Sequence, residues 1–191
     1  MVTGRGYLRR SLFGCLVAAG IGALISFAPV SSPVAHADAD YGGGCVLFAD
    51  SRAATLDSLR LRCTPEQQES IFREARRGDV PVGVREGWLI SPRDMQSWAS
   101  AAWLGKSFHT GPDGGYLLNR VSPAGIEAWP ANVYSGSSVL DGQSAWEIDY
   151  APSPTPQLLD EIREITPGVW FGYCWSRDPA GPQYRLTFAL A

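Results

Sequence analysis

The chain has 191 residues and a formal net charge of −3 at pH 7, with 16 basic and 19 acidic side chains. Lys106 is its single lysine and the arginines are scattered, so the sequence contains no basic patch that would attract a polyanion. Composition therefore argues against nucleic acid and against an anionic membrane surface as partners.

Residues 1–37 predict an export signal. Three arginines precede an apolar run over residues 12–30, and Ala35-His36-Ala37 follows it. This order is typical of a secretory signal peptide, which we expect to be cleaved between Ala37 and Asp38. An uncleaved anchor is the alternative, because the apolar run is nearly long enough to span a membrane. The Arg9-Arg10 pair leaves both the general and the twin-arginine export routes open.

Cleavage leaves 154 residues with a net charge of −6, because three arginines leave with the signal. This length fits one domain with a substantial core. We expect residues 38–44, which are polar and glycine-rich, to form a flexible lead-in. Residues 45–191 then form a single globular domain, helical over 45–104 and mainly β over 105–191. The expected product is a secreted monomer, extracellular or in the cell envelope, with no stable membrane insertion.

Helical signals come first in the mature chain. Apolar spacing over residues 46–61 fits a modest helix, interrupted near Asp50-Ser51. Thr64-Pro65-Glu66-Gln67 gives a clearer helix start, with a capping hydroxyl, a proline in the first turn and a glutamine three residues on. Ser91-Pro92 opens a third helix, which Gly105 ends.

Strand signals dominate from residue 106 onward. Six segments separated by Gly, Pro, Asp and Ser turns alternate or are rich in β-formers: residues 106–109, 116–121, 126–134, 143–150, 169–176 and 184–190. Asp141-Gly142 predicts a hairpin turn. Leucines and isoleucines over residues 156–166 predict one further helix, with four charged residues on an exposed face: Asp160, Glu161, Arg163 and Glu164. The sum is an α+β domain whose antiparallel sheet curls into a barrel or half-barrel.

Cysteine and histidine limit the chemistry. The mature chain keeps Cys45, Cys63 and Cys174, so an oxidising compartment favours one disulfide with one cysteine left over. A continuous helix would hold Cys45 and Cys63 about 25 Å apart. Either that helix is broken, or the bond ties the N-terminal segment to Cys174. With His109 as its one histidine, the mature chain predicts no metal site.

The order of four short motifs resembles that of GXWXG-type lipocalin-like proteins and of related secreted actinobacterial proteins of unknown function. The motifs are Gly87-Trp88, Trp103-Leu104-Gly105-Lys106-Ser107-Phe108, Leu140-Asp141-Gly142 and Ile148-Asp149-Tyr150. The similarity runs from about residue 81 to the C-terminus. It implies a small curled sheet that holds an apolar ligand, and it supplies no catalytic residues.

Small barrels bind ligands inside, between aromatic walls and a few fixed polar groups. We therefore expect a secreted binding protein for a small apolar or amphipathic ligand, such as a lipid or acyl chain, with no cofactor. The candidate ligand-binding residues are Trp103, Lys106, Asn119, Tyr134, Trp146, Asp149 and Tyr150. Lys106 is expected to point across the barrel mouth to Asp149 or to a ligand carboxylate, or to have no role.

Two other functions stay open at this stage. A small-molecule isomerase or hydrolase would use an inward Asp149 or Glu147 with His109 or Tyr150 as an acid–base pair. A structural or interaction domain of the cell envelope would instead fill the barrel with its own side chains. A filled interior would leave only the structural domain. An open apolar cavity would favour the binding protein, and an open cavity with a buried carboxylate beside His109 would favour the enzyme.

Overall fold

Eight antiparallel strands form the main sheet of the computed structural model, which describes residues 37–122 and 124–191. The predicted signal peptide lies outside these residues apart from Ala37. The strands are β3 (Gly83–Ser91), β4 (Gly105–Gly111), β5 (Gly114–Arg120), β6 (Glu127–Ser137), β7 (Ser144–Asp149), β8 (Leu158–Thr166), β9 (Val169–Asp178) and β10 (Gly181–Leu190).

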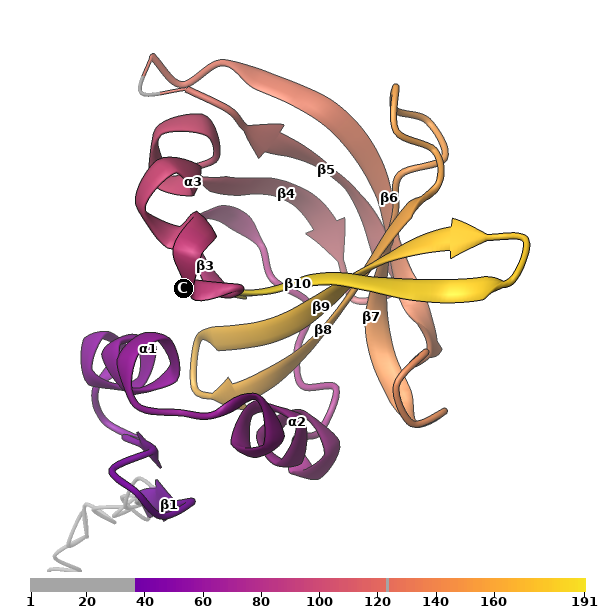
Figure 1. The fold of residues 1–191 in the computed structure, drawn as a ribbon. Coiled ribbons are helices and arrows are strands. Elements are labelled where there is room, and N and C mark those ends of the chain that lie inside the picture. Colours follow the sequence, from indigo (N-terminus) through magenta and orange to yellow (C-terminus); the bar gives the residue numbers. More distant parts are fainter. Residues whose placement is uncertain (1–36, 123) are drawn as a thin grey trace, which may run out of the picture. The chain divides into compact units, whose positions relative to one another are not determined.

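The sheet closes on itself. Each strand pairs with the next along the chain, and β10 returns to pair with β3, which gives an up-and-down barrel (Figure 1). Closure leaves no strand edge of this sheet open to pair with another chain. The predicted α+β class with an antiparallel barrel is confirmed, and the barrel is whole, not half.

Helices precede the barrel and interrupt it once. α1 (Arg52–Leu61) begins at Ser51, whose hydroxyl accepts a hydrogen bond from the Ala54 amide. α2 (Pro65–Glu74) begins at the predicted capping box, in which Thr64 and Gln67 satisfy each other's backbone amides. A short 3₁₀ turn, η1 (Arg93–Met95), leads into α3 (Gln96–Ala102) between β3 and β4. None of the helices described has the length and apolarity needed to cross a membrane.

The predicted helix over residues 156–166 is wrong, because this segment is strand β8. It pairs with β7 on one side and β9 on the other and so completes the barrel wall. Leu158 and Asp160 face the interior, whereas Arg163 lies under α2. Its charged residues Asp160, Glu161 and Arg163 are buried instead of exposed, and each is paired or hydrogen-bonded. Those partners come from distant segments, which a local pattern does not show.

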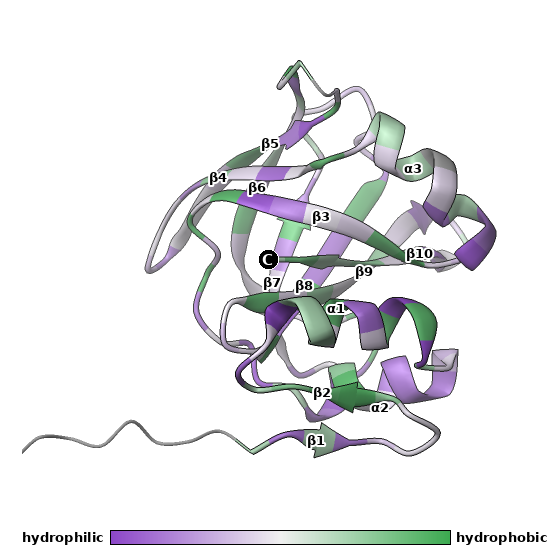
Figure 2. Ribbon diagram, turned by 90° about the vertical axis from the view of Figure 1, so that its left-hand side faces the viewer, coloured by the Kyte–Doolittle hydropathy of each residue, from purple (hydrophilic) through white to green (hydrophobic). Residues whose placement is uncertain are grey.

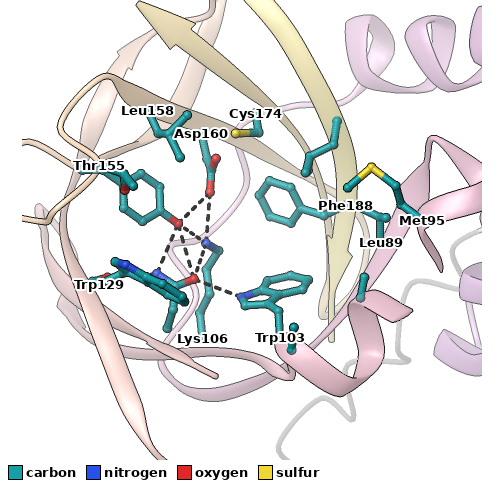
Figure 3. A pocket seen from close by; sticks show the side chains of 15 residues that line it. Leu89, Met95, Trp103, Lys106, Trp129, Thr155, Leu158, Asp160, Cys174 and Phe188 are labelled. Atoms are coloured by element: carbon teal, nitrogen blue, oxygen red, sulfur yellow. Dashed lines mark hydrogen bonds and ion pairs between the residues drawn. The ribbon is translucent and has the colours of Figure 1, made fainter. Parts of the chain in front are cut away.

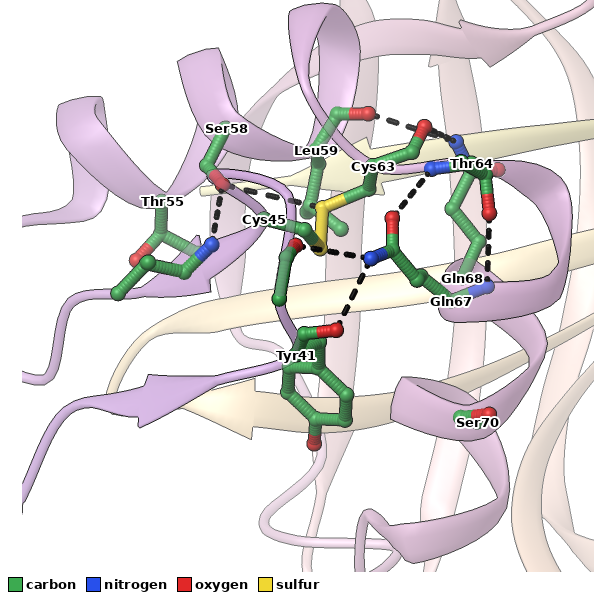
Figure 4. The surroundings of a disulfide bond; sticks show 12 residues. Tyr41, Cys45, Thr55, Ser58, Leu59, Cys63, Thr64, Gln67, Gln68 and Ser70 are labelled. Carbon is green, nitrogen blue, oxygen red and sulfur yellow. Dashed lines mark hydrogen bonds between the residues drawn. A yellow bond between two sulfur atoms is a disulfide. The ribbon is translucent and has the colours of Figure 1, made fainter.

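A disulfide joins Cys45 to Cys63, with their Cα atoms 4.6 Å apart (Figure 4). The bond is possible because α1 starts only at Arg52, after a short pair of strands, β1 (Ala39–Asp40) and β2 (Val46–Leu47), and ends before Cys63. The interrupted-helix alternative therefore holds. Cys174 is free and buried.

Two apolar cores lie on opposite sides of the barrel wall. The outer core packs α1 and α2 against the outward side chains of β9, with Phe72 edge-on to Phe171 and Tyr173. Figure 2 shows that α1 and α2 carry both hydrophobic and hydrophilic residues, as expected of helices with one packed face. The inner core fills one end of the barrel. There the indoles of Trp146 and Trp170 donate hydrogen bonds to the carbonyls of Gly78 and Asp79, which close that end.

Candidate functional site

The other end of the barrel interior is hollow. A cavity of about 450 Å³ lies between the barrel wall and α3 (Figure 3). Most of its lining is apolar and comes from β3, η1, α3, β8 and β10: Leu89, Met95, Ala99, Ala102, Leu158, Leu186 and Phe188. Small-molecule sites are concave and mostly apolar in this way, with a few fixed polar groups.

Four buried polar residues form a cluster on the cavity wall. Lys106 on β4 stands opposite Asn119 on β5, while Asp160 comes from β8 and Tyr150 follows β7. All four are at most 6% exposed. The Lys106 ammonium donates hydrogen bonds to Asn119 Oδ1 at 3.1 Å, to Asp160 Oδ2 at 3.0 Å and to the Tyr150 hydroxyl oxygen.

Further hydrogen bonds make this cluster one network. The Tyr150 hydroxyl donates to Asp160 Oδ2 at 3.0 Å. The Trp103 indole donates to Asn119 Oδ1 at 3.0 Å, and Asn119 Nδ2 donates to the Trp129 carbonyl at 2.9 Å. These bonds connect strands β4, β5, β6 and β8 with Trp103 of the β3–β4 connection and Tyr150 just after β7, so the cluster holds fixed positions.

The neighbouring phenol and thiol are kept protonated. Burial, followed by the nearby Asp160 charge, raises the pKa of Tyr150 well above its ordinary value. Burial and the same carboxylate raise the pKa of Cys174, which stands opposite Asp160 on β9. A thiol with a raised pKa is a poor nucleophile. The site therefore presents fixed hydrogen-bonding groups and no activated nucleophile.

Trp129 is held over the cavity by an irregular backbone. Its φ is 49°, a conformation that bulky residues rarely adopt. The β5–β6 pairing shifts between Leu117 and Asn119, which leaves Trp129 and Pro130 in a bulge. The Asn119 side chain fixes that bulge through the Trp129 carbonyl, and the Trp129 side chain lines the cavity while remaining 42% exposed.

The structure brings together four of the seven candidate ligand-binding residues: Trp103, Lys106, Asn119 and Tyr150 all line the cavity. Trp146 lies in the packed end instead. Tyr134 and Asp149 are on the outer face, where Tyr134 donates to Asp149 and Arg177 pairs with Asp149 at 2.8 Å. The expected contact of Lys106 with Asp149 is therefore wrong. The Asp149 side chain lies outside the barrel, and Lys106 pairs with Asp160, whose side chain lies inside it.

His109, Asp149 and Tyr150, the main residues of the catalytic alternative, do not meet. His109 is exposed on β4 and stacks on Tyr116, with ring centroids 4.7 Å apart. Asp149 is engaged by Arg177 outside the barrel, whereas Tyr150 faces the cavity. An acid–base pair of Asp149 with His109 or Tyr150 has no geometric basis here. Among the described residues, no three His, Cys, Asp or Glu side chains gather as a metal site requires.

Sequence reasoning missed Asp160 and did not single out Trp129. The pattern of residues 156–166 places Asp160 on an exposed helical face and not on an inward-facing strand. One signal that points to it is Lys106 itself, because a lysine buried in a barrel needs a carboxylate partner. For Trp129, the signal is Pro130, because a proline inside a strand that is paired on both sides marks a bulge.

Comparison with known proteins adds little to this geometry. No family model matches the chain, and no curated protein does. A crystal structure of a protein from Thermomonospora curvata is similar over 68% of this chain and 87% of that chain, with 18% identity and a TM-score of 0.46. The resemblance to GXWXG-type lipocalin-like proteins thus stays a prediction.

Proposed function

We propose that this protein is a secreted binding protein that holds a small apolar or amphipathic molecule, of the size of a lipid acyl chain, inside the barrel. The observation that carries the proposal is the cavity of about 450 Å³ with apolar walls and a buried polar cluster. Protein interiors are close-packed, and small barrels without ligands are filled by side chains. Here one end is filled in that way and the other end is not.

The size of the cavity limits the ligand. An apolar cavity of about 150 Å³ holds one benzene molecule. A cavity of 450 Å³ therefore accommodates on the order of 15–20 carbon atoms. That is the scale of one acyl chain or of a compact polycyclic molecule, and it falls within the usual range of ligand sites.

Export is part of the same proposal. Its support is the basic and apolar pattern of residues 1–37 with the Ala35-His36-Ala37 site, together with the Cys45–Cys63 disulfide. Disulfides form and persist in oxidising compartments outside the cytoplasm. A carrier there would take up molecules from the surroundings of the cell or from its envelope.

The test is native mass spectrometry of the protein exported from the full-length sequence, followed by organic extraction of any bound molecule. We expect a reproducible added mass of a few hundred daltons, consistent with the cavity volume. Ala99→Phe adds a ring inside the cavity and should abolish the added mass. Ala101→Phe makes the same change on the exposed side of α3, outside the cavity lining, and should keep it.

The contrary outcome is equally clear. Protein that carries no added mass, and that takes up no member of a panel of acyl chains after refolding, would contradict ligand binding. A structural role in the cell envelope would then be the better interpretation.

A further inference from the structure

The charges of the cavity cancel each other. Among the residues that the structure describes, Lys106 and Asp160 are the charged side chains of the lining, and they pair at 3.0 Å. An anionic head group would have to compete with Asp160 for Lys106 and lie beside a second negative charge. A cationic head group would meet the same difficulty at Lys106. Burying a charge without its own partner is unfavourable, so this pair disfavours both.

The donors of the cluster are already used. The ammonium of Lys106 has three hydrogens and meets three acceptors. Asn119 Nδ2 has the Trp129 carbonyl and the Tyr150 oxygen within reach, and the Trp103 indole is bonded to Asn119 Oδ1. The Tyr150 hydroxyl donates to Asp160. A ligand that only accepts hydrogen bonds, such as an ester or a ketone, would find no free donor in this cluster; the remaining hydroxyl of the lining, that of Thr155, lies 3.0 Å from the Ser153 hydroxyl.

One strong acceptor remains. Both hydrogen bonds to Asp160, from Lys106 and from Tyr150, end on Oδ2 (Figure 3). Its Oδ1 accepts no hydrogen bond from a nitrogen or oxygen donor of residues 37–122 and 124–191, although the side chain is only 5% exposed. The Cys174 thiol opposite it is hydrogen-bonded to Asp160, but a thiol is only a weak donor. A carboxylate oxygen that lies on a cavity wall and has no strong donor is a position for a ligand hydroxyl.

From this arrangement we propose that the ligand is a neutral amphiphile whose head group carries a hydroxyl, and that Asp160 Oδ1 accepts its hydrogen bond. The inference rests on the proposed function and specifies its ligand class. Figure 3 shows the polar cluster on one side of the cavity and Phe188, Leu89 and Met95 on the other, so that a tail would lie against the apolar side.

The test is calorimetric titration of the exported protein, stripped of any ligand, with four probes that share one chain: lauryl alcohol, methyl laurate, lauric acid and laurylamine. We expect the alcohol to bind about tenfold or more tightly than each of the others at pH 7, because a hydrogen bond to a charged group is gained only with it. Binding of laurate or of the ester with equal or higher affinity would overturn the inference and leave the proposed function standing. Failure of all four probes would overturn both.

A matched pair of variants locates the effect. Asp160→Asn leaves Lys106 without its carboxylate, so the preference should shift by about tenfold or more from alcohol towards laurate. Asp141→Asn removes a carboxylate from the buried ion pair with Arg163, which lies outside the cavity lining, and should leave the order of the four probes unchanged. An unchanged order in folded Asp160→Asn would contradict the role of Asp160. If that variant does not fold, the wild-type series decides the question alone.

Discussion

Strand β8 contributes one buried ion pair to each side of the barrel wall, and the two pairs differ in how completely they are satisfied. On the outer side, Arg163 forms two hydrogen bonds with Asp141, each 2.7 Å long. The same guanidinium donates to the carbonyls of Phe72 and Ser144 and stacks on the Phe72 ring at 4.4 Å. This pair joins α2, the β6–β7 turn and β8, and its side chains are only 0% and 4% exposed.

On the inner side, Asp160 and Lys106 are as deeply buried but border the cavity. Asp160 keeps one oxygen without a nitrogen or oxygen donor from the described part of the chain. The same strand thus supplies a pair that the protein itself completes and a pair that a ligand would complete. The two ion pairs are alike in burial and in charge. They differ because the inner pair borders a cavity and has a carboxylate oxygen without a strong donor.

The largest expected effect comes from breaking the outer pair. Arg163→Met leaves Asp141 buried without its cation, which should lower the free energy of unfolding by about 3–5 kcal/mol. Urea unfolding measures this loss, while the probe affinities of the folded variant stay as in the wild type. Arg73→Met, which removes the exposed pair with Glu69, is the control and should cost less than about 1 kcal/mol. Similar losses in the two variants would contradict a structural role of the outer pair.

Breaking the inner pair should destabilise less and change ligand preference more. Lys106→Met leaves Asp160 without its cation, but Tyr150 still donates a hydrogen bond to it, so we expect a loss of about 2–3 kcal/mol. The freed carboxylate should now favour laurylamine, whose ammonium takes the place of the lysine. The comparison between the pairs fails if this variant keeps the wild-type order of probes.

Acid should act on the outer pair. The hydrogen bonds from Arg163 lower the pKa of Asp141 from 3.8 to about 2. A carboxyl group whose pKa is lower in the folded state stabilises the fold above pH 3.8, and that contribution of about 2 kcal/mol disappears as the pH falls through about 2. Asp141→Asn should therefore lose less stability than the wild type over this range in urea unfolding.

The quantity to compare is the difference in the free energy of unfolding between the wild type and Asp141→Asn, because Glu161 changes stability with pH in the opposite direction. Burial raises the pKa of Glu161, so its protonation stabilises the folded state as the pH falls. If the curves of wild type and Asp141→Asn stay parallel down to about pH 2, the outer pair does not depend on the Asp141 charge.

The sequence predicts most of the barrel because strand alternation and turn residues are local signals. It fails at β8, where Leu158, Leu159, Ile162 and Ile165 fit a helical stripe as well as a strand. The charges between them indicate an exposed helix unless their partners are known. Those partners, Lys106 and Asp141 among them, are brought to β8 only by the closed sheet.

The candidate site shows the same contrast between residues found from local signals and residues placed by tertiary contacts. Trp103, Lys106, Asn119 and Tyr150 are found from sequence because they lie on or beside strands that the sequence predicts. Asp160 is missed together with β8, and the position of Trp129 depends on a bulge fixed by the Asn119 side chain. Pro130 indicates a bulge in this strand, but the contact with Asn119 that fixes it is tertiary and is not visible in a pattern of residue types.

The smallest expected effect on stability concerns Trp129 and tests whether the cavity side carries strain that the outer side lacks. Trp129→Gly and Trp129→Ala both remove the ring from the cavity, but only glycine adopts a φ of 49° without a Cβ clash. We expect the glycine variant to be more stable than the alanine variant by about 1 kcal/mol in urea unfolding, and both to bind lauryl alcohol about tenfold more weakly than the wild type. Equal stability of the two variants would show that the bulge is not strained. Unchanged affinity would remove Trp129 from the binding site.

If both expectations hold, the protein keeps a strained residue at the place where a ligand would be in contact with it, whereas the fully satisfied Arg163–Asp141 pair contributes to stability alone.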